Sequence, residues 1–404
     1  MKIAFYLDNK NSKDIDYSQP YMGNPGVGGT QFMISLLSWY YAQKYKNNNI
    51  ILYAPYVDFL PNETNNVQAN SLIEAYAQAD EDKADFFICR STKEVSFFNH
   101  INKGKTKVIL WGHNFATFKE LNLIAKSKTV AQYICVSKEQ LKLIQGHKAF
   151  HKSSYIYNAI PTDIYPENND TRNDRSICYL GSIVPSKGFD VTAKLWRHLY
   201  DRGIKVKLHV IGSGQLYNKS AELGEYGIAQ QEFENQFIKY LIDDKGNMLD
   251  DVIFHGLLKF KEKTDVMADM TIGIINPTGE TETFGISAIE FQALNIPVIT
   301  CNRGGLKNTV MDGNTGYLSN SFEELAEKTE KLLDLYSNNP DKYFAMAQNA
   351  RSFILNNFDI NLSIEVWNEL LTGLYRNEKI RKDLPKVSTI QKVKNYFNLF
   401  FYIQ

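Results

Sequence analysis

Short apolar runs recur along the whole chain, and most are followed by a polar loop and then by a stretch with helical spacing. Alternation of this kind predicts βαβ units, in which helices connect parallel strands. The runs fall into two series with a break between them. The predicted strands are 3–7, 50–54, 86–89, 107–111, 131–136 and 154–157 in the first series, and 177–180, 206–211, 252–255, 272–275 and 297–300 in the second, followed by a turn and short strand over 311–318.

A polar segment at 161–175, which holds two prolines and many Asn and Asp residues, lies between the two series and reads as a linker. We therefore predict an α/β chain of two facing, Rossmann-like, doubly wound domains at 1–160 and 176–358. A helix at about 360–376 is expected to pack back on the first domain, and 377–404 is expected to form a tail. Ligands of such sheets bind beyond the strand C-termini, which predicts a site in an interdomain cleft.

Composition excludes several classes of protein. The 404 residues include 45 basic and 45 acidic side chains, so the chain lacks the basic excess of a general nucleic-acid binder. The N-terminus turns polar too early for a signal peptide, and no run approaches the ~18 apolar residues of a membrane span. We expect a cytoplasmic protein, soluble or peripheral on the inner membrane face. Its four cysteines have no CxxC spacing and are expected to be buried free thiols: Cys89, Cys135, Cys178 and Cys301.

One strand–loop–helix–strand unit carries two glutamates separated by seven residues. Glu282 ends a polar loop at the mouth of a predicted helix, and Glu290 lies in the first turns of that helix. Unpaired backbone N–H groups at a helix mouth attract anions, and carboxylates accept hydrogen bonds from hydroxyls. The unit therefore predicts a ligand that is part phosphate and part hydroxyl, such as a sugar nucleotide. The alternatives are an acid favoured by the helix dipole for Glu282 and a solvated helix residue for Glu290.

Taken together and in order, these segments resemble the signature of retaining GT-B glycosyltransferases of family four. The resemblance spans roughly residues 1–376, and the order and spacing of the motifs make it specific. The segments that carry it are Gly28-Gly29-Thr-Gln31, Asn158-Ala-Ile-Pro161, Tyr179-Leu-Gly-Ser-Ile-Val-Pro-Ser-Lys-Gly188, Val210-Ile-Gly-Ser-Gly214, Asn276-Pro-Thr278, Glu282-x7-Glu290, Gly304-Gly305 and Asp312-Gly-Asn-Thr-Gly316.

The resemblance implies roles for residues of the second domain. Glu282 matches a carboxylate that hydrogen-bonds the donor sugar, and Glu290 matches the residue that holds the ribose hydroxyls. Lys187 matches the phosphate-binding lysine, whose charge is worth most as negative charge grows on the leaving diphosphate. Backbone N–H groups facing sugar and phosphate are expected from the residues between the two glutamates, namely Thr283, Phe284, Gly285 and Ile286.

The same resemblance implies roles for residues of the first domain, and the sequence departs from the family pattern at one position. Gly28–Gly29 matches a loop near the diphosphate, and His113 matches a histidine close to donor sugar and acceptor. A flexible glycine turn and a structural loop histidine are the alternatives. Ser182 stands at a donor-binding position where the family usually has Arg, so one phosphate cation is missing. Arg303 or Lys259 are the candidates to replace it.

The predicted function is a retaining hexosyltransferase of polysaccharide biosynthesis. It would move a sugar from a nucleotide-diphosphate sugar to a hydroxyl of a saccharide or lipid-linked glycan. No metal or other cofactor is expected, because no DxD pair follows a strand. The alternatives are a non-catalytic sugar-nucleotide-binding or partner module of the same fold and a nucleotide-sugar 2-epimerase. A dehydrogenase is disfavoured because Gly212-Ser-Gly214 lacks the third glycine of a dinucleotide fingerprint.

The C-terminal tail is basic and aromatic, and its apolar residues are spaced roughly as on an amphipathic helix. Such a helix either lies on an anionic membrane surface or packs against the body of the protein or a twin subunit. The residues that define the pattern are Lys382, Lys386, Lys392 and Lys394 together with Ile390, Val393, Phe397, Phe400 and Phe401.

Overall fold

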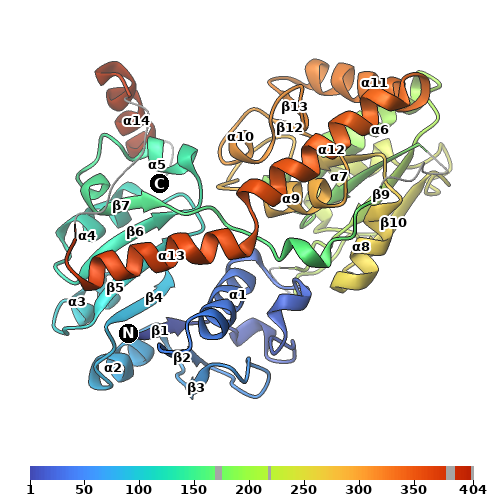
Figure 1. Cartoon of the computed structure of the whole chain (residues 1–404). Coiled ribbons are helices and arrows are strands. Elements are labelled where there is room, and N and C mark those ends of the chain that lie inside the picture. The colour runs from blue at the N-terminus through green and yellow to red at the C-terminus, as the bar shows by residue number, and fades with distance from the viewer. Residues whose placement is uncertain (169–174, 217–219, 379–386, 402–404) are drawn as a thin grey trace. The chain divides into compact units, whose positions relative to one another are not determined.

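The computed structural model describes the chain except for residues 169–174, 217–219, 379–386 and 402–404 (Figure 1). It divides into two compact units. The first unit comprises Met1–Pro161 together with Ile360–Gln404, and the second comprises Thr162–Asp359. Each unit is built on one parallel sheet, as the alternation of apolar runs and helical stretches predicts.

The first unit has a seven-stranded sheet in the order β3-β2-β1-β4-β5-β6-β7, with every neighbouring pair parallel. The order runs outward from β1 in both directions, as in a Rossmann-like doubly wound fold. The outermost strand on one side, β3, was not predicted, because its sequence Asn-Asn-Val-Gln is polar and only partly buried. The strands are β1 (Lys2–Tyr6), β2 (Asn49–Ala54), β3 (Asn65–Gln68), β4 (Phe86–Arg90), β5 (Lys107–Gly112), β6 (Val130–Cys135) and β7 (Ser153–Tyr155).

Helices connect these strands, and a helix from the end of the chain completes the unit. The helix α13 (Ile360–Tyr375) packs here through Trp367, which is fully buried with its ring 4.9 Å from that of Trp111. The hydroxyl of Tyr41 donates to Asn368 at 2.7 Å on the same helix. The other helices of the unit are α1 (Gly29–Lys44), α2 (Leu72–Glu81), α3 (Val95–Ile101), α4 (Phe118–Lys126), α5 (Lys138–Leu143) and α14 (Thr389–Phe401).

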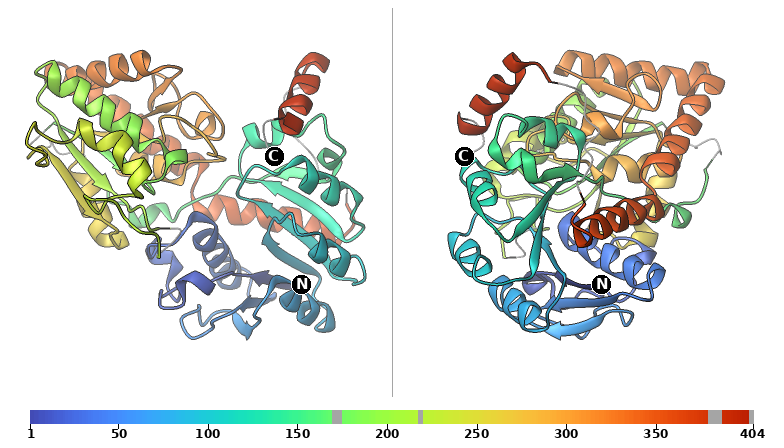
Figure 2. Two further views of the ribbon diagram at one scale, coloured as in Figure 1. Left: turned by 180° about the vertical axis from the view of Figure 1, so that it is seen from behind. Right: turned by 60° about the vertical axis from the view of Figure 1, so that its left-hand side comes forward.

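The second unit has a six-stranded parallel sheet in the order β10-β9-β8-β11-β12-β13. Its core is rich in aromatic side chains, with Phe189, Trp196, Phe237 and Tyr343 all fully buried. The strands are β8 (Ser176–Leu180), β9 (Lys207–Ile211), β10 (Val252–Gly256), β11 (Ile272–Ile275), β12 (Val298–Cys301) and β13 (Gly316–Ser319). The helices are α6 (Phe189–Asp201), α7 (Gln231–Phe237), α8 (Phe260–Ala268), α9 (Ile286–Ala293), α10 (Leu306–Thr309), α11 (Phe322–Asn338) and α12 (Pro340–Asn357), and Figure 2 shows them from two further directions.

The segment predicted as a linker is partly structured. Thr162 begins a short 3₁₀ helix and its backbone N–H donates to Asp359 at 3.3 Å. Tyr165 is buried, and the amide of Asn168 donates to the carbonyl of Ala268 at 2.6 Å. These contacts attach residues 162–168 to the second unit, while 169–174 lie outside the described residues.

Two expectations drawn from composition can be compared with the structure. All four cysteines are buried and free, as predicted. Over the part of the chain that the structure describes, no helix has the length and apolar character needed to cross a membrane.

Candidate functional site

The loop between β11 and α9 is organised by Asn276. Its side-chain oxygen accepts from the hydroxyl of Thr278 at 2.9 Å and from the backbone N–H of Gly279 at 3.0 Å. Its amide nitrogen donates to the Glu282 carboxylate at 3.2 Å and to the Glu280 carbonyl at 3.3 Å. Asn276 has φ 32°, a left-handed conformation that Asn tolerates better than most residues. One amide thus fixes both the shape of the loop and the position of Glu282.

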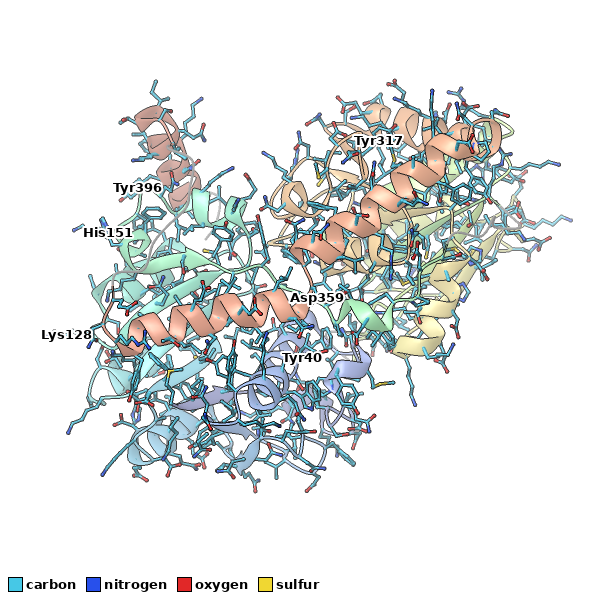
Figure 3. All side chains as sticks on the ribbon, viewed as in Figure 1. Tyr40, Lys128, His151, Tyr317, Asp359 and Tyr396 are labelled. Atoms are coloured by element: carbon cyan, nitrogen blue, oxygen red, sulfur yellow. The ribbon has the colours of Figure 1, made fainter. Side chains whose placement is uncertain are left out.

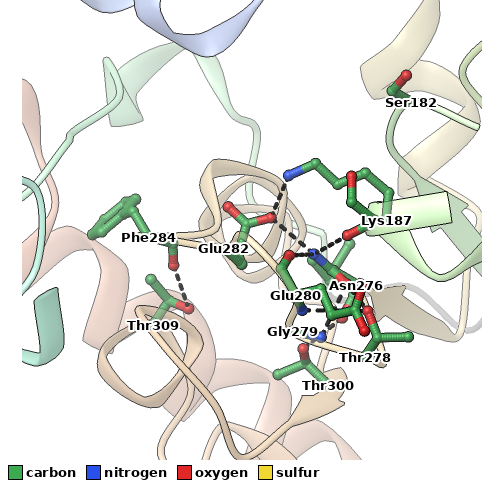
Figure 4. A network of polar contacts seen from close by, with 12 residues as sticks. Ser182, Lys187, Asn276, Thr278, Gly279, Glu280, Glu282, Phe284, Thr300 and Thr309 are labelled. Carbon is green, nitrogen blue, oxygen red and sulfur yellow. Dashed lines mark hydrogen bonds and ion pairs between the residues drawn. The ribbon is translucent and has the colours of Figure 1, made fainter. Parts of the chain in front are cut away.

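Lys187 and Glu282 form an ion pair beside this loop. The ammonium of Lys187 lies 2.7 Å from Oε2 of Glu282, the oxygen that also accepts from Asn276 (Figure 4). The two side chains are 20% and 16% exposed, so both remain accessible to a ligand. Lys187 ends a short 3₁₀ helix (Pro185–Lys187) after β8, and the Tyr179 hydroxyl lies 3.1 Å from its carbonyl oxygen. Two predicted site residues are therefore in direct contact.

Glycines permit the close approach of these segments. Gly188 has φ 66°, and a Cβ there would lie 2.8 Å from a methyl carbon of Thr278. Gly285 has φ 97° at the N-cap of α9, and a Cβ there would lie 2.6 Å from Leu306. Both positions exclude a larger side chain on conformational and on steric grounds. The first brings the Lys187 segment against the loop, and the second starts the helix that carries Glu290.

Glu290 lies in a separate, more deeply buried cluster. Its Oε1 accepts from the ammonium of Lys263 at 2.6 Å and from the hydroxyl of Tyr165 at 3.0 Å. The side chains of Lys263 and Glu290 are 9% and 6% exposed. The ring of Phe260 packs edge-on to that of Tyr165, with 5.2 Å between the ring centroids. The Lys263 ammonium lies over the Phe260 ring, 5.7 Å from its centroid. Burial and the Glu290 charge raise the pKa of Tyr165 well above its usual value, so the hydroxyl stays a donor.

Sequence reasoning missed Lys263, Tyr165 and the central role of Asn276. Lys263 sits in a lysine-rich stretch that looks solvated, yet it lies three residues after Phe260 and four before the fully buried Met267. That spacing places it on the buried face of α8, a signal that the periodicity carries. Tyr165 lies inside the predicted linker, where only its own apolar ring hints at burial. The solvated reading of Glu290 is wrong, since its partners bury it.

Ser182 lies apart from the Lys187–Glu282 network (Figure 4). It is 2% exposed, and its hydroxyl donates to the carbonyl of Ser213 at 3.3 Å. The side chain at this position therefore contacts the neighbouring loop after β9. Lys259 and Arg303, the candidates to replace the missing cation, are both exposed, at the N-cap of α8 and after β12. Their replacement of the family arginine stays a prediction.

The remaining predicted residues belong to the first unit. Gly28 is the N-cap of α1 and Gly29 is its first residue. His113 follows β5, with its ring 4.6 Å from that of Trp111. Burial, with a smaller contribution from the charge of Arg90, lowers the pKa of His113 to about 3, so its imidazole is neutral at physiological pH. In its neutral form the ring has one donor and one acceptor nitrogen.

The segment that carries Glu282 and Glu290 thus joins two lysine–glutamate pairs, one accessible and one buried. Cations suit phosphate oxygens, and carboxylates suit sugar hydroxyls. Within the described residues, no group of three or more His, Cys, Asp or Glu side chains is arranged to hold a metal ion.

Comparison with known proteins covers most of the second unit. The family described as Glycosyl transferases group 1 matches residues 162–353. The capsular polysaccharide biosynthesis glycosyltransferase CapM of Staphylococcus aureus is 31% identical over 196 residues, which are 48% of this chain and 44% of that protein. An uncharacterised glycosyltransferase of Haemophilus influenzae is 24% identical over 279 residues, 66% of this chain and 69% of that protein. The match to CapM thus spans less than half of its length.

Solved structures resemble the chain over nearly its whole length. A glycosyltransferase from Rickettsia africae superposes with a TM-score of 0.71 at 16% identity, covering 93% of this chain and 99% of that one. The Anabaena protein Alr3699/HepE, solved in complex with UDP-glucose, gives a TM-score of 0.68 at 15% identity, covering 92% and 100%. At these identities the likeness concerns the fold. The chain has the two-domain GT-B fold, and residues 162–353 of its second unit match the glycosyl transferases group 1 family.

Proposed function

We propose that this protein is a retaining glycosyltransferase that moves a sugar from a nucleotide-diphosphate sugar to a hydroxyl of an acceptor glycan. The observation that carries the proposal is the accessible Lys187–Glu282 pair, in which a cation for phosphate and an acceptor for sugar hydroxyls lie 2.7 Å apart. The match of residues 162–353 to the group 1 family supports it. So does the structural neighbour solved with UDP-glucose.

Lys187 is assigned to the diphosphate of the donor. When the bond between sugar and phosphate breaks, negative charge grows on the leaving oxygens. A cation held there stabilises the transition state more than the ground state, which is the condition for faster chemistry. In the unliganded pair this charge is shared with Glu282, so an incoming diphosphate competes with that carboxylate for Lys187.

Glu282 is assigned to the hydroxyls of the donor sugar. Its carboxylate oxygens accept hydrogen bonds, and Asn276 holds one of them in place. The acceptor hydroxyl would attack from the face that the nucleotide leaves, which retains the anomeric configuration. A phosphate oxygen of the leaving group would take the acceptor's proton. This route needs no metal and no second carboxylate as base.

Glu290 is assigned to the ribose hydroxyls, with Lys263 and Tyr165 fixing its carboxylate. Backbone N–H groups of 283–286 are assigned to sugar and phosphate at the start of α9. In the first unit, the family resemblance assigns Gly28–Gly29 to the diphosphate and His113 to the donor sugar and acceptor.

The acceptor is proposed to be a saccharide or lipid-linked glycan of polysaccharide biosynthesis, and the transferred group a hexose. The named function of the CapM relative favours this class. Four buried free thiols fit a reducing compartment, and we assign the reaction to the cytoplasm.

A thermal-shift panel of sugar nucleotides tests donor binding first, since a ligand that binds only the folded state raises the melting temperature by mass action. The selected donor is then offered with candidate acceptors, and the anomeric configuration of the product is read by NMR. Lys187→Ala and Glu282→Ala should each abolish turnover. Lys261→Ala, which removes a lysine from an exposed pair with Asp265 in the same unit, should leave it unchanged.

Two outcomes would replace the proposal with its alternatives. A wild-type protein that binds a sugar nucleotide yet neither hydrolyses nor transfers it with any acceptor is a binding module. A product that is the C2 epimer of the donor sugar, formed without an acceptor, identifies an epimerase.

A further inference from the structure

The helix α14 is attached to the first unit along one side. The amide of Asn395 donates to the carbonyl of Lys142 on α5 at 2.9 Å, and Leu399 is 1% exposed. The ring of Tyr396 packs edge-on to Phe118 at 5.3 Å between centroids and lies parallel to His147 at 6.5 Å. Figure 3 labels Tyr396 on this helix. These contacts set which face of the helix points away from the protein. Of the two alternatives for the tail, packing against the body of the protein is therefore present on this side of the helix.

The opposite side of α14 exposes an apolar stripe. Ile390, Val393 and Phe397 are 72%, 50% and 54% exposed. Their spacing of three and then four residues places them on one face of the helix. Burial of large apolar side chains is the main favourable term in folding, so three of them held outward on one face mark a surface that binds something. Phe400 and Phe401 have side chains outside the described residues.

The surroundings of the stripe are basic. The 13 residues of α14 include Lys392 and Lys394, both exposed, and no Asp or Glu. The segment of the first unit on which the helix packs, 138–152, has four lysines and a single acidic residue, Glu139. Glu139 is paired with Lys142 at 2.6 Å. The chain as a whole is neutral, so this excess of positive charge is local.

We propose that α14 is a membrane-surface helix that lies in the headgroup region of a bilayer rich in anionic lipid. Apolar side chains on one face of a helix that carries lysines and no acidic residue are the features of helices that bury one face at the acyl boundary. Lysines near an anionic surface add electrostatic attraction. The contacts of Asn395, Tyr396 and Leu399 hold the stripe outward in advance, so binding does not have to order the helix.

A second copy of the chain fits this surface less well. Three side chains offer an area on the order of a few hundred Å², whereas a stable protein–protein interface buries about 1,200–2,000 Å². Two basic surfaces brought together would also repel each other. An anionic bilayer matches both the size and the charge. The proposal does not depend on the enzymatic assignment, because vesicle binding is measured without any donor or acceptor.

Flotation with vesicles tests the proposal on the full-length protein. Vesicles of phosphatidylcholine mixed with phosphatidylglycerol should carry the protein, and vesicles of phosphatidylcholine alone should carry much less. The triple variant Ile390→Ser, Val393→Ser, Phe397→Ser should lower the partition coefficient roughly tenfold or more. Lys392→Gln and Lys394→Gln should each lower it about fivefold, and added salt should reproduce that loss.

The matched control is Leu362→Ser with Val366→Ser, which removes two exposed apolar side chains from α13 and should leave binding unchanged. Circular dichroism and light scattering establish that every variant is folded and of unchanged size. Absence of binding to the mixed vesicles, or equal binding by the triple variant, overturns the proposal. So does a wild-type dimer that the triple variant converts to a monomer, since that result assigns the stripe to a second copy.

Discussion

Replacing Glu282 by Gln should separate nucleotide binding from sugar transfer. The substitution keeps the size and shape of the side chain and removes its negative charge. Lys187 then no longer shares its ammonium with a carboxylate 2.7 Å away. A nucleoside diphosphate without a sugar should bind the Glu282→Gln variant more tightly than the wild type, whereas transfer from the complete donor should fall.

The magnitude follows from the exposure of the pair. Two unit charges about 4 Å apart interact by about 1 kcal/mol in bulk water and by about 4 kcal/mol at an effective dielectric constant of about 20. Exposed pairs measured in proteins contribute about 0.2–1 kcal/mol. The Lys187–Glu282 side chains are 20% and 16% exposed, so about 1 kcal/mol is a fair value. That corresponds to about fivefold tighter binding of the diphosphate. The lost contact with the sugar should lower kcat about a hundredfold.

Isothermal titration with UDP, or with whichever nucleoside diphosphate the donor panel selects, measures the first effect. Lys187→Ala should weaken binding, and adding Glu282→Gln to it should bring no gain, because the cation that the substitution releases is absent. Asp265→Asn, which breaks the exposed pair with Lys261, is the matched control and should change neither quantity. If Glu282→Gln weakens diphosphate binding as much as Lys187→Ala does, the competition between carboxylate and phosphate is refuted.

Three further predictions concern stability. Lys263→Met leaves the buried Glu290 carboxylate without its cation and should lower the free energy of unfolding, measured by chemical denaturation, by about 3 kcal/mol. Adding Glu290→Leu should recover most of that loss. An unchanged denaturation midpoint in Lys263→Met would contradict the buried pair. Trp367→Ala, beside Trp111, should destabilise the first unit by about 3–5 kcal/mol, whereas a loss below 1 kcal/mol would mean that α13 is loosely attached. Burial holds the pKa of His113 at about 3 against an ordinary 6.5, so between these values only the unfolded chain takes up a proton at this residue. The free energy of unfolding should therefore fall by up to about 1.4 kcal/mol per pH unit as the pH drops through that range. His113→Gln should remove this pH dependence.

The strands were largely predictable because parallel strands in a doubly wound sheet are short and nearly all apolar. Predicted strands such as 272–275 and 107–111 agree with β11 and β5 to within a residue. The exception is β3, whose polar sequence carries no such signal. It pairs with β2 at the edge of the sheet, where backbone hydrogen bonds rather than apolar burial hold the strand.

The site was predictable only in part. The motifs identified Lys187 and Glu282, and the structure brings them into contact. They identified Glu290, while its partners Lys263 and Tyr165 come from a lysine-rich helix and from a predicted linker. Periodicity places Lys263 on the buried face of α8, but local sequence could not reveal which carboxylate it meets, because a lysine and a tyrosine become site residues only when distant segments bury them against one carboxylate.

For the C-terminal tail, too, the sequence predicted one part of the result and the structure supplied the other. Its sequence indicated an amphipathic basic helix but left open whether the apolar residues face the protein or its surroundings. The structure answers this residue by residue, since Leu399 packs on the first unit and Ile390 and Phe397 point outward.

The sequence alone determined the α/β class, the two series of strands, the glycine-rich turns and the residue types that suit a phosphorylated sugar. Each of these depends on local periodicity or on backbone conformation, which neighbouring residues set. Tertiary structure alone decided which lysine neutralises which glutamate, that Asn276 shapes the loop of Glu282, and that Ser182 turns to Ser213. Those outcomes depend on contacts between segments up to 125 residues apart, as between Tyr165 and Glu290, and on burial, which makes an unpaired charge costly.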